Sequence, residues 1–206
     1  MENIQDHLKD ISEIRAMMER NSKFLSLSGL SGVSAGICAL VGAGMAYGFL
    51  DQFLQFRSAP PAVMRRELLT FFITDAVLVI IAAISLALLF SWRMAKKKQL
   101  PFWTGTSKLL LLNLLIPLIA GGAFCLILVL QGAYAYVGAS MLLFYGMALL
   151  NASKFTLPEI RYLAITELVL GLACAIWYGH GFLFWSLGFG VAHIIYGAVM
   201  YFKYER

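Results

Sequence analysis

Residues 68–92 read LLTFFITDAVLVIIAAISLALLFSW, and Asp75 is the only charged residue among these 25. A helix of about 20 mainly apolar residues is long enough to cross the roughly 30 Å hydrocarbon layer of a membrane. The chain has 206 residues, of which 61% are hydrophobic and 13% are charged, whereas a soluble domain is about half apolar and a quarter charged. The stretch predicts a membrane-spanning helix. The composition excludes a disordered chain, a disulfide scaffold and an ordinary soluble enzyme.

Five further stretches share this length and apolar character. The predicted spans cover residues 25–49, 68–92, 108–130, 135–151, 160–178 and 182–202. Short links containing glycine separate the third span from the fourth and the fifth from the sixth, which predicts two antiparallel helical hairpins. We therefore predict an all-α integral membrane protein in which residues 24–206 form one bundle of six transmembrane helices.

Residues 1–23 have a different pattern and are predicted to form a separate amphipathic helix, cytoplasmic or at the membrane interface. Apolar residues recur there at helical spacing between charged ones, namely Ile4, Leu8, Ile11, Ile14 and Met18. Acidic side chains slightly outnumber basic ones in this segment, which disfavours simple adhesion to anionic lipid. We favour packing against protein, either the bundle or a cytoplasmic partner. The polar, acidic start differs from a cleavable signal peptide, so the first span is expected to direct insertion.

The basic residues predict the orientation of the chain. With the amino terminus in the cytoplasm, 13 of the 16 Lys and Arg residues lie on the inner side and only Arg57, Arg65 and Arg66 lie outside. Positive charge gathers on the cytoplasmic side of membrane proteins, so both termini are predicted to be cytoplasmic, with a bacterial inner membrane as the expected location. No basic stripe interleaved with aromatic residues is present, and a nucleic-acid partner is therefore not expected.

The first span carries small residues at a spacing of four or a multiple of four, namely Ser28, Gly32, Gly36, Gly44 and Gly48. Small residues on one helix face let two helix backbones approach closely within a membrane. The partner of this face is either another helix of the same chain or a second copy in a homo-oligomer, and both alternatives stay open at this point.

Away from the ends of the predicted spans, three acidic or histidine side chains remain, namely Asp75, Glu167 and His193. Each costs roughly 2.5–3.5 kcal/mol at the centre of a membrane helix, so such residues are functional candidates. Glu167 and His193 lie at comparable depth in the two helices of the last hairpin, which makes a hydrogen bond between them sterically possible. The pair is interpreted either as a structural clamp or as a proton-responsive or ligand-binding element.

Further polar residues lie in the inner halves of the spans. Asn113 and Pro117 share the third span, where the proline removes a backbone hydrogen bond and predicts a kink. Interrupted helices of this kind hold substrates in transporters. Tyr145, Asn151 and Tyr196 are expected to complete a polar cavity. Asp75, near Thr70 and Thr74, is expected either to be protonated or to line an outer vestibule.

Motifs for other chemistry are sparse. Cys38, Cys125 and Cys174 lack metal-ligand or redox spacing, no histidine pair fits a haem, and no cofactor or metal is expected. The Gly29-Leu30-Ser31-Gly32 motif, with His193 and Gly197 in the sixth span, resembles the serine–histidine arrangement of rhomboid intramembrane proteases. The resemblance implies a six-helix protease, but here the serine motif opens the first span rather than the fourth. The histidine-and-asparagine element of the family's second span is missing.

These features support three functional hypotheses. The first is a transporter or channel-like protein for protons or a small solute, with substrate or proton candidates Asp75, Asn113, Glu167, His193 and Tyr196. The second is a non-enzymatic scaffold or regulatory subunit that docks a cytoplasmic partner through residues 1–23. The third is an intramembrane enzyme with His193 as the base, for which the sequence offers no convincing nucleophile. An enzyme is the least favoured of the three.

Overall fold

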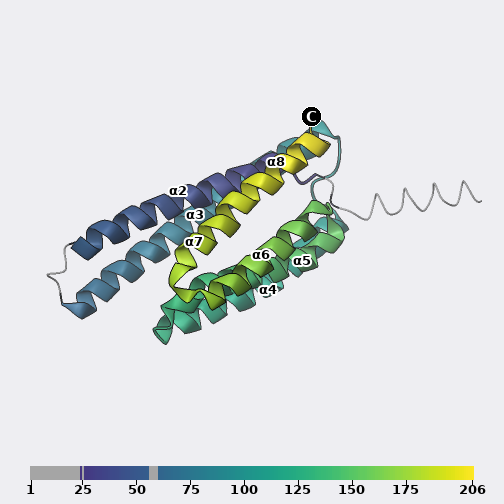
Figure 1. Cartoon of the computed structure of the whole chain (residues 1–206). Helices are drawn as coiled ribbons and strands as arrows, with labels where there is room; N and C mark the ends of the chain where they lie inside the picture. Colours follow the sequence, from purple (N-terminus) through teal and green to yellow (C-terminus); the bar gives the residue numbers. More distant parts are fainter. Residues whose placement is uncertain (1–23, 25, 56–59) are drawn as a thin grey trace, which may run out of the picture.

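Every regular element that the computed structural model describes, within residues 24, 26–55 and 60–206, is helical (Figure 1). The helix predicted for residues 1–23 lies outside the described residues. The elements are α2 (Gly29–Gln55), α3 (Pro61–Lys97), α4 (Gly105–Leu130), η1 (Tyr134–Tyr136), α5 (Val137–Ala152), η2 (Ser153–Phe155), α6 (Glu159–Ile176), η3 (Tyr178–His180), α7 (Gly181–Trp185), η4 (Ser186–Ala192) and α8 (His193–Tyr204). All six predicted stretches are therefore helical.

Five helical stretches are long and apolar enough to cross a membrane, judged by length and composition. They run over Gly29–Phe53, Ala62–Lys97, Gly105–Leu130, Tyr134–Phe155 and Tyr178–Tyr204. The fifth predicted span, α6, is the exception because three of its 18 residues are charged, namely Glu159, Arg161 and Glu167. The all-helical prediction is thus confirmed, and five of the six predicted spans are long and apolar enough to cross a membrane.

Local sequence explains where α4 begins and ends. The side chain of Thr104 accepts a hydrogen bond from the backbone of Ser107, and the Ser107 hydroxyl accepts one in return from the backbone of Thr104. This reciprocal capping satisfies two donors that a helix start leaves free. Gly132, in the turn after α4, has a φ of 76°, a left-handed conformation that glycine adopts without steric strain. Short turns therefore join α4 to α5, as predicted.

The long helices pack in two groups, which Figure 1 shows as an upper and a lower layer. In the first group α2 packs against both α3 and α8, and in the second α5 packs between α4 and α6. The final helical stretch connects them, because α7 contacts α5 and α6 while α8 contacts mainly α2. The segment η4 lies between α7 and α8 and touches both groups.

Glycines bring α2 and α8 into backbone contact. A methyl group at position 36 would lie 2.6 Å from the carbonyl oxygen of Gly190, and one at position 197 would lie 2.5 Å from the backbone nitrogen of Val33. Both distances are shorter than carbon atoms tolerate, so the helices approach this closely only because side chains are absent. The small-residue face of the first span therefore serves contact within the chain.

The end of the same predicted stripe that carries Gly44 and Gly48 does not take part in the contact with α8. A methyl group at Gly44 or Gly48 would meet nothing within 4 Å, whereas Gly32 and Gly36 face α8. Ser28, at the other end of the stripe, donates a hydrogen bond to Glu205 beyond α8, at 3.2 Å. The homo-oligomer face remains a prediction, and only Gly44 and Gly48 are open to such a contact.

Gly36→Ala should destabilise the protein, because the added methyl group would overlap Gly190 and Ile194. Overpacking of this kind costs about 1–3 kcal/mol. Gly44→Ala is the matched control in the same helix, and it should leave stability unchanged or slightly raised because alanine favours helix. Thermal unfolding of the purified chain in detergent measures both changes. Equal midpoints for the two variants would contradict the α2–α8 contact.

Candidate functional site

A short π-helical segment positions the histidine of the site. The segment η4 spans Ser186–Ala192, and His193 follows as the first residue of α8. The backbone N–H of His193 bonds to the carbonyl of Gly190, while its ring Nδ1 lies 3.0 Å from the carbonyl oxygen of Gly188. π-helical turns in proteins occur frequently at functional sites. The irregular turn thus places a carbonyl group against the imidazole ring.

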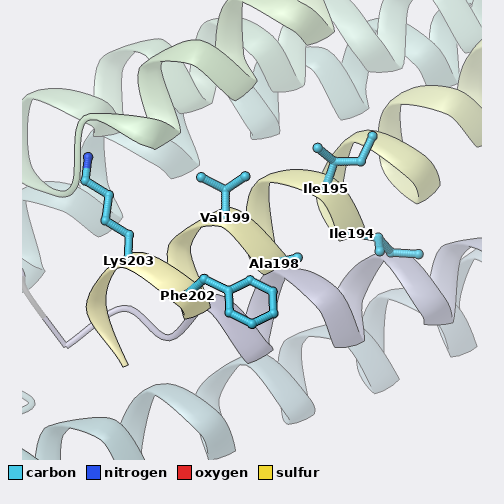
Figure 2. Close-up of a pocket in the computed structure, with 6 residues that line it drawn as sticks. All are labelled: Ile194, Ile195, Ala198, Val199, Phe202 and Lys203. Carbon is cyan, nitrogen blue, oxygen red and sulfur yellow. The ribbon is translucent and has the colours of Figure 1, made fainter. Parts of the chain in front are cut away.

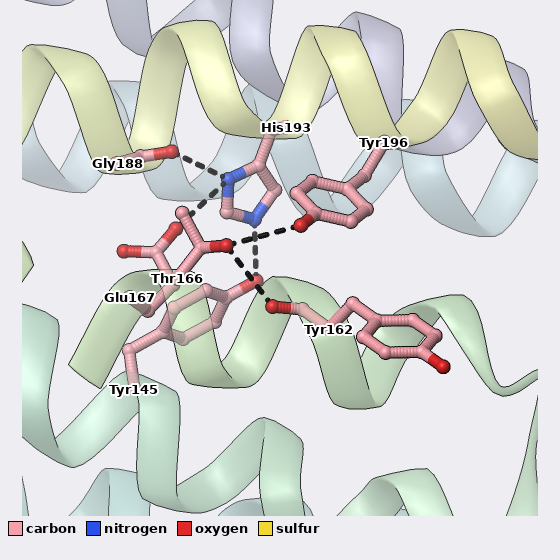
Figure 3. A network of polar contacts seen from close by, with 7 residues as sticks. All are labelled: Tyr145, Tyr162, Thr166, Glu167, Gly188, His193 and Tyr196. Carbon is pink, nitrogen blue, oxygen red and sulfur yellow. Dashed lines mark hydrogen bonds and ion pairs between the residues drawn. The ribbon is translucent and has the colours of Figure 1, made fainter. Parts of the chain in front are cut away.

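The ring of His193 has polar neighbours on both nitrogens (Figure 3). Its Nδ1 lies 3.4 Å from Oε1 of Glu167 in α6, and its Nε2 lies 2.7 Å from the hydroxyl of Tyr145 in α5. Because the Gly188 carbonyl only accepts, Nδ1 carries the proton in the neutral ring. Nε2 then accepts a hydrogen bond from Tyr145, so the surroundings select one tautomer.

Glu167 is the most completely buried charged residue in the described part of the chain, with an exposed fraction of 0%, and His193 is 6% exposed. Within the described ranges neither carboxylate oxygen of Glu167 has a hydrogen-bond partner. A methyl group at Gly188 would lie 2.5 Å from Oε2, so the glycine makes room for the carboxylate. A buried carboxylate with so few donors is costly in its charged form unless it is paired.

A pair of hydroxyl groups extends the polar contact between α6 and α8. The hydroxyls of Thr166 and Tyr196 lie 3.0 Å apart, and Thr166 also donates to the carbonyl of Tyr162 at 3.1 Å. Thr166 is next to Glu167 in the chain, and Tyr196 is about one turn after His193. Figure 3 shows both pairs between the same two helices. The structure therefore brings together four predicted residues, Tyr145, Glu167, His193 and Tyr196.

The other predicted residues lie elsewhere. The side-chain amide of Asn113 donates to the carbonyl of Leu109 in its own helix, at 2.8 Å, and α4 runs as one helix through Pro117. Asn151 lies near the end of α5. Two surface grooves, on α3 and on α8, are lined by other residues than Glu167 and His193. Neither groove is lined by Asn113, so neither joins Asn113 to the site as predicted.

Asp75 lies apart from this network, between α3 and α2. A methyl group at Gly42 would lie 3.5 Å from its carboxylate, and its Oδ1 is buried without a hydrogen-bond partner among the described residues. Thr74 donates instead to the carbonyl of Thr70, at 2.8 Å. The two carboxylates inside the predicted spans therefore belong to separate helix contacts.

The described residues do not form the serine–histidine contact on which the rhomboid resemblance depends. The hydroxyl of Ser31 donates to the carbonyl of Ser28, whereas the ring of His193 faces Tyr145, Gly188 and Glu167. The serine–histidine contact of a rhomboid protease is thus not among these interactions. Within the described residues no group of three or more His, Cys, Asp or Glu side chains gathers closely enough to hold a metal.

A second polar cluster ties the end of α8 to both helix groups. Lys203 lies 2.6 Å from Oε1 of Glu159 at the start of α6, and the Tyr204 hydroxyl donates to the same carboxylate at 3.0 Å. Glu205 accepts hydrogen bonds from the Ser28 hydroxyl and from the backbone N–H of Gly29, where α2 begins. A carboxylate is favourable at a helix start because unpaired N–H groups point towards it. This cluster lies at the end predicted to be cytoplasmic.

The neighbours of Glu159, which precedes the span predicted at 160–178, change its titration. Burial alone would raise the pKa of Glu159, but the hydrogen bonds from Lys203 and Tyr204 and the charge of Lys203 lower the pKa below its ordinary value of 4.5. The ionised form is therefore favoured in the folded state, and the cluster contributes stability wherever Glu159 is charged.

Comparisons of the chain with protein-family models, with curated proteins and with solved structures gave no match.

Glu159→Gln should lower stability by about 1 kcal/mol at neutral pH, because it removes a partly exposed ion pair. The folded-state pKa of Glu159 is lowered, so its stabilisation is complete above the ordinary pKa of 4.5 and is lost as the pH falls through the folded value. The difference in thermal midpoint between wild type and variant should therefore shrink in acid. A difference that is constant from neutral to acidic pH would contradict this role.

Tyr145→Phe should destabilise the site, because it leaves Nε2 of the buried His193 without its donor. An unpaired buried acceptor costs about 1–3 kcal/mol. Tyr162→Phe is the matched control, since the Tyr162 side chain is 61% exposed and its ring points away from the network (Figure 3). The ¹⁵N chemical shift of Nε2 in the His193 ring reports the loss of this hydrogen bond. Identical shifts in both variants would show that Tyr145 does not donate to Nε2.

Proposed function

We propose that the chain is an integral membrane protein with six spans, formed by α2, α3, α4, α5, α6 and the final α7–α8 stretch. We further propose that Glu167 and His193 form a proton-binding site that links protonation to transport of protons or a small solute. The candidate spans support the membrane location. The short separation and deep burial of the two side chains support the proton site.

One observation carries this proposal, namely the burial of the Glu167 carboxylate without a hydrogen-bond donor in the described part of the chain. An ionised carboxylate in such surroundings is stabilised by the nearby His193 when the imidazole is protonated. A proton on the carboxylate removes the charge altogether. Both routes use a proton, and ionisable residues inside a membrane are typical of proton pathways.

The available space favours a proton over a solute as the ligand of this pair. Gly188 is in close contact with the Glu167 carboxylate, and both nitrogens of the His193 ring are within reach of protein atoms. A solute between these groups would have to separate the helices first. The proton occupies no such volume, and a transported solute would bind elsewhere along the junction of the helix groups.

The location of the pair offers a way to couple protonation to movement. Glu167 belongs to the α4–α5–α6 group, while His193 lies where the last helix leaves this group and packs on α2. A change of charge on either residue alters how strongly the last helix binds α6. Protonation thus shifts the balance between two arrangements of the groups, which is how a ligand drives a conformational change.

Glu167→Gln tests the proposal, because glutamine keeps the shape of the side chain and binds no proton. Infrared difference spectra between acidic and alkaline buffer contain a C=O band from every carboxyl group that titrates, and the band of the buried Glu167 should be present in wild type and absent from the variant. In proteoliposomes with an enclosed pH-sensitive dye, proton flux driven by a pH gradient should fall roughly 100-fold, as for loss of a positioned proton-transfer group. Glu67→Gln, at an exposed position on α3, is the matched control.

The result distinguishes a proton site from a structural clamp. If Glu167→Gln has the same difference spectrum and flux as wild type and only a lower thermal midpoint, the pair is a clamp and the proposal fails. The scaffold hypothesis would then take precedence. It concerns residues 1–23 and is tested separately, by asking whether their deletion releases a partner that co-purifies with the chain.

A further inference from the structure

The exposed face of α8 carries an apolar groove of about 670 Å³ (Figure 2). Its lining residues are Ile194, Ile195, Ala198, Val199, Phe202 and Lys203. Five of these six are apolar, and Ile195, Val199 and Phe202 are each about half exposed or more. Figure 2 shows Ile195, Val199 and Lys203 projecting from the same side of the helix. The groove is therefore an apolar surface with one charged end.

The groove has the length of one membrane leaflet. Ile194 and Lys203 are nine residues apart, which corresponds to about 14 Å along a helix. Half of the hydrocarbon layer of a bilayer is about 15 Å thick. A groove that follows α8 over this distance matches a single acyl chain of the leaflet on the side of the carboxy terminus, rather than a solute that crosses the membrane.

One basic side chain, that of Arg206, lies beyond the Lys203 end of the groove, where a lipid headgroup would lie. The Arg206 guanidinium lies 5.9 Å from the ring centre of Phe202, and Lys203 lines the groove. The facing carboxylates are engaged elsewhere, Glu159 with Lys203 and Tyr204, and Glu205 with the start of α2. Among the described residues Arg206 forms no salt bridge. Its charge is therefore available to a ligand outside the chain.

We propose that this groove binds an anionic phospholipid, with one acyl chain along Ile194–Lys203 and the phosphate at Arg206. The apolar wall contributes hydrophobic burial of the acyl chain. A guanidinium binds phosphate oxygens through paired hydrogen bonds, which selects for the headgroup. The site rests on the membrane location of the chain and is independent of the proton-binding role of Glu167.

Native mass spectrometry of the purified full-length chain tests the groove, with phosphatidylglycerol or phosphatidylcholine added as the probe. Wild type should retain one phosphatidylglycerol more strongly than phosphatidylcholine. Ala198→Phe fills the groove and should lose this lipid, whereas the same substitution at exposed Ala82 of α3 should retain it. Arg206→Gln should retain both lipids equally, because it removes the charge that selects the anionic headgroup.

Equal retention of phosphatidylglycerol by Ala198→Phe and Ala82→Phe would overturn the groove as the site, and a wild type without headgroup preference would overturn the anionic ligand. A photo-crosslinker gives a second measurement if Ala198→Phe does not fold. Ile195→p-benzoylphenylalanine should enrich phosphatidylglycerol over its share in a mixed bilayer, and the same change at exposed Ile80 should not. Crosslinking in the bulk ratio at both positions would overturn the proposal. Neither readout depends on proton transfer by Glu167.

Discussion

The backbones of α2 and α8 touch at glycines, and the position of His193 depends on this contact. A methyl group at Gly32 would lie 3.3 Å from the carbonyl oxygen of His193, so the backbone of this residue packs directly on α2. Its imidazole projects from the opposite side of α8 towards Glu167 and Tyr145. His193 thus belongs both to the close-packed contact with α2 and to the polar contact with Glu167 and Tyr145. The packing of its backbone on α2 fixes the position of its ring in the polar contact.

The final helical stretch connects two groups of helices that otherwise pack mainly within themselves. It does so through different chemistry along its length. Glycines bind it to α2, the His193 ring meets α5 and α6, and the Lys203–Glu159 pair joins its far end to the start of α6. Each polar contact with α6 joins the two helix groups. The proton-binding proposal concerns His193 at the start of α8, and the lipid-binding proposal concerns the exposed face of the same helix. Both proposals would affect how the two groups hold together.

Sequence patterns predicted the helices well, because long apolar runs are recognisable without tertiary information. They also allowed a hydrogen bond between Glu167 and His193, since a short hairpin places two residues at equal distance from its turn in neighbouring helices. Asn113 was assigned to the same cavity on depth alone. Depth does not specify the direction of a side chain around the helix axis, and Asn113 bonds to its own helix instead. The role of Tyr145 as the partner of Nε2 depends on the rotation of α5 for the same reason.

The amino-acid sequence by itself determined which segments are helical, which of them are apolar enough for a membrane, and which ionisable residues lie within them. Hydrophobicity and glycine or proline links are local properties, so they can be read along the chain. Only the tertiary structure decided that Gly32 and Gly36 face α8 while Gly44 stays open, and that a π-helical turn directs the Gly188 carbonyl to His193. These features depend on how each helix is rotated about its axis, which the packing of all its neighbours sets together.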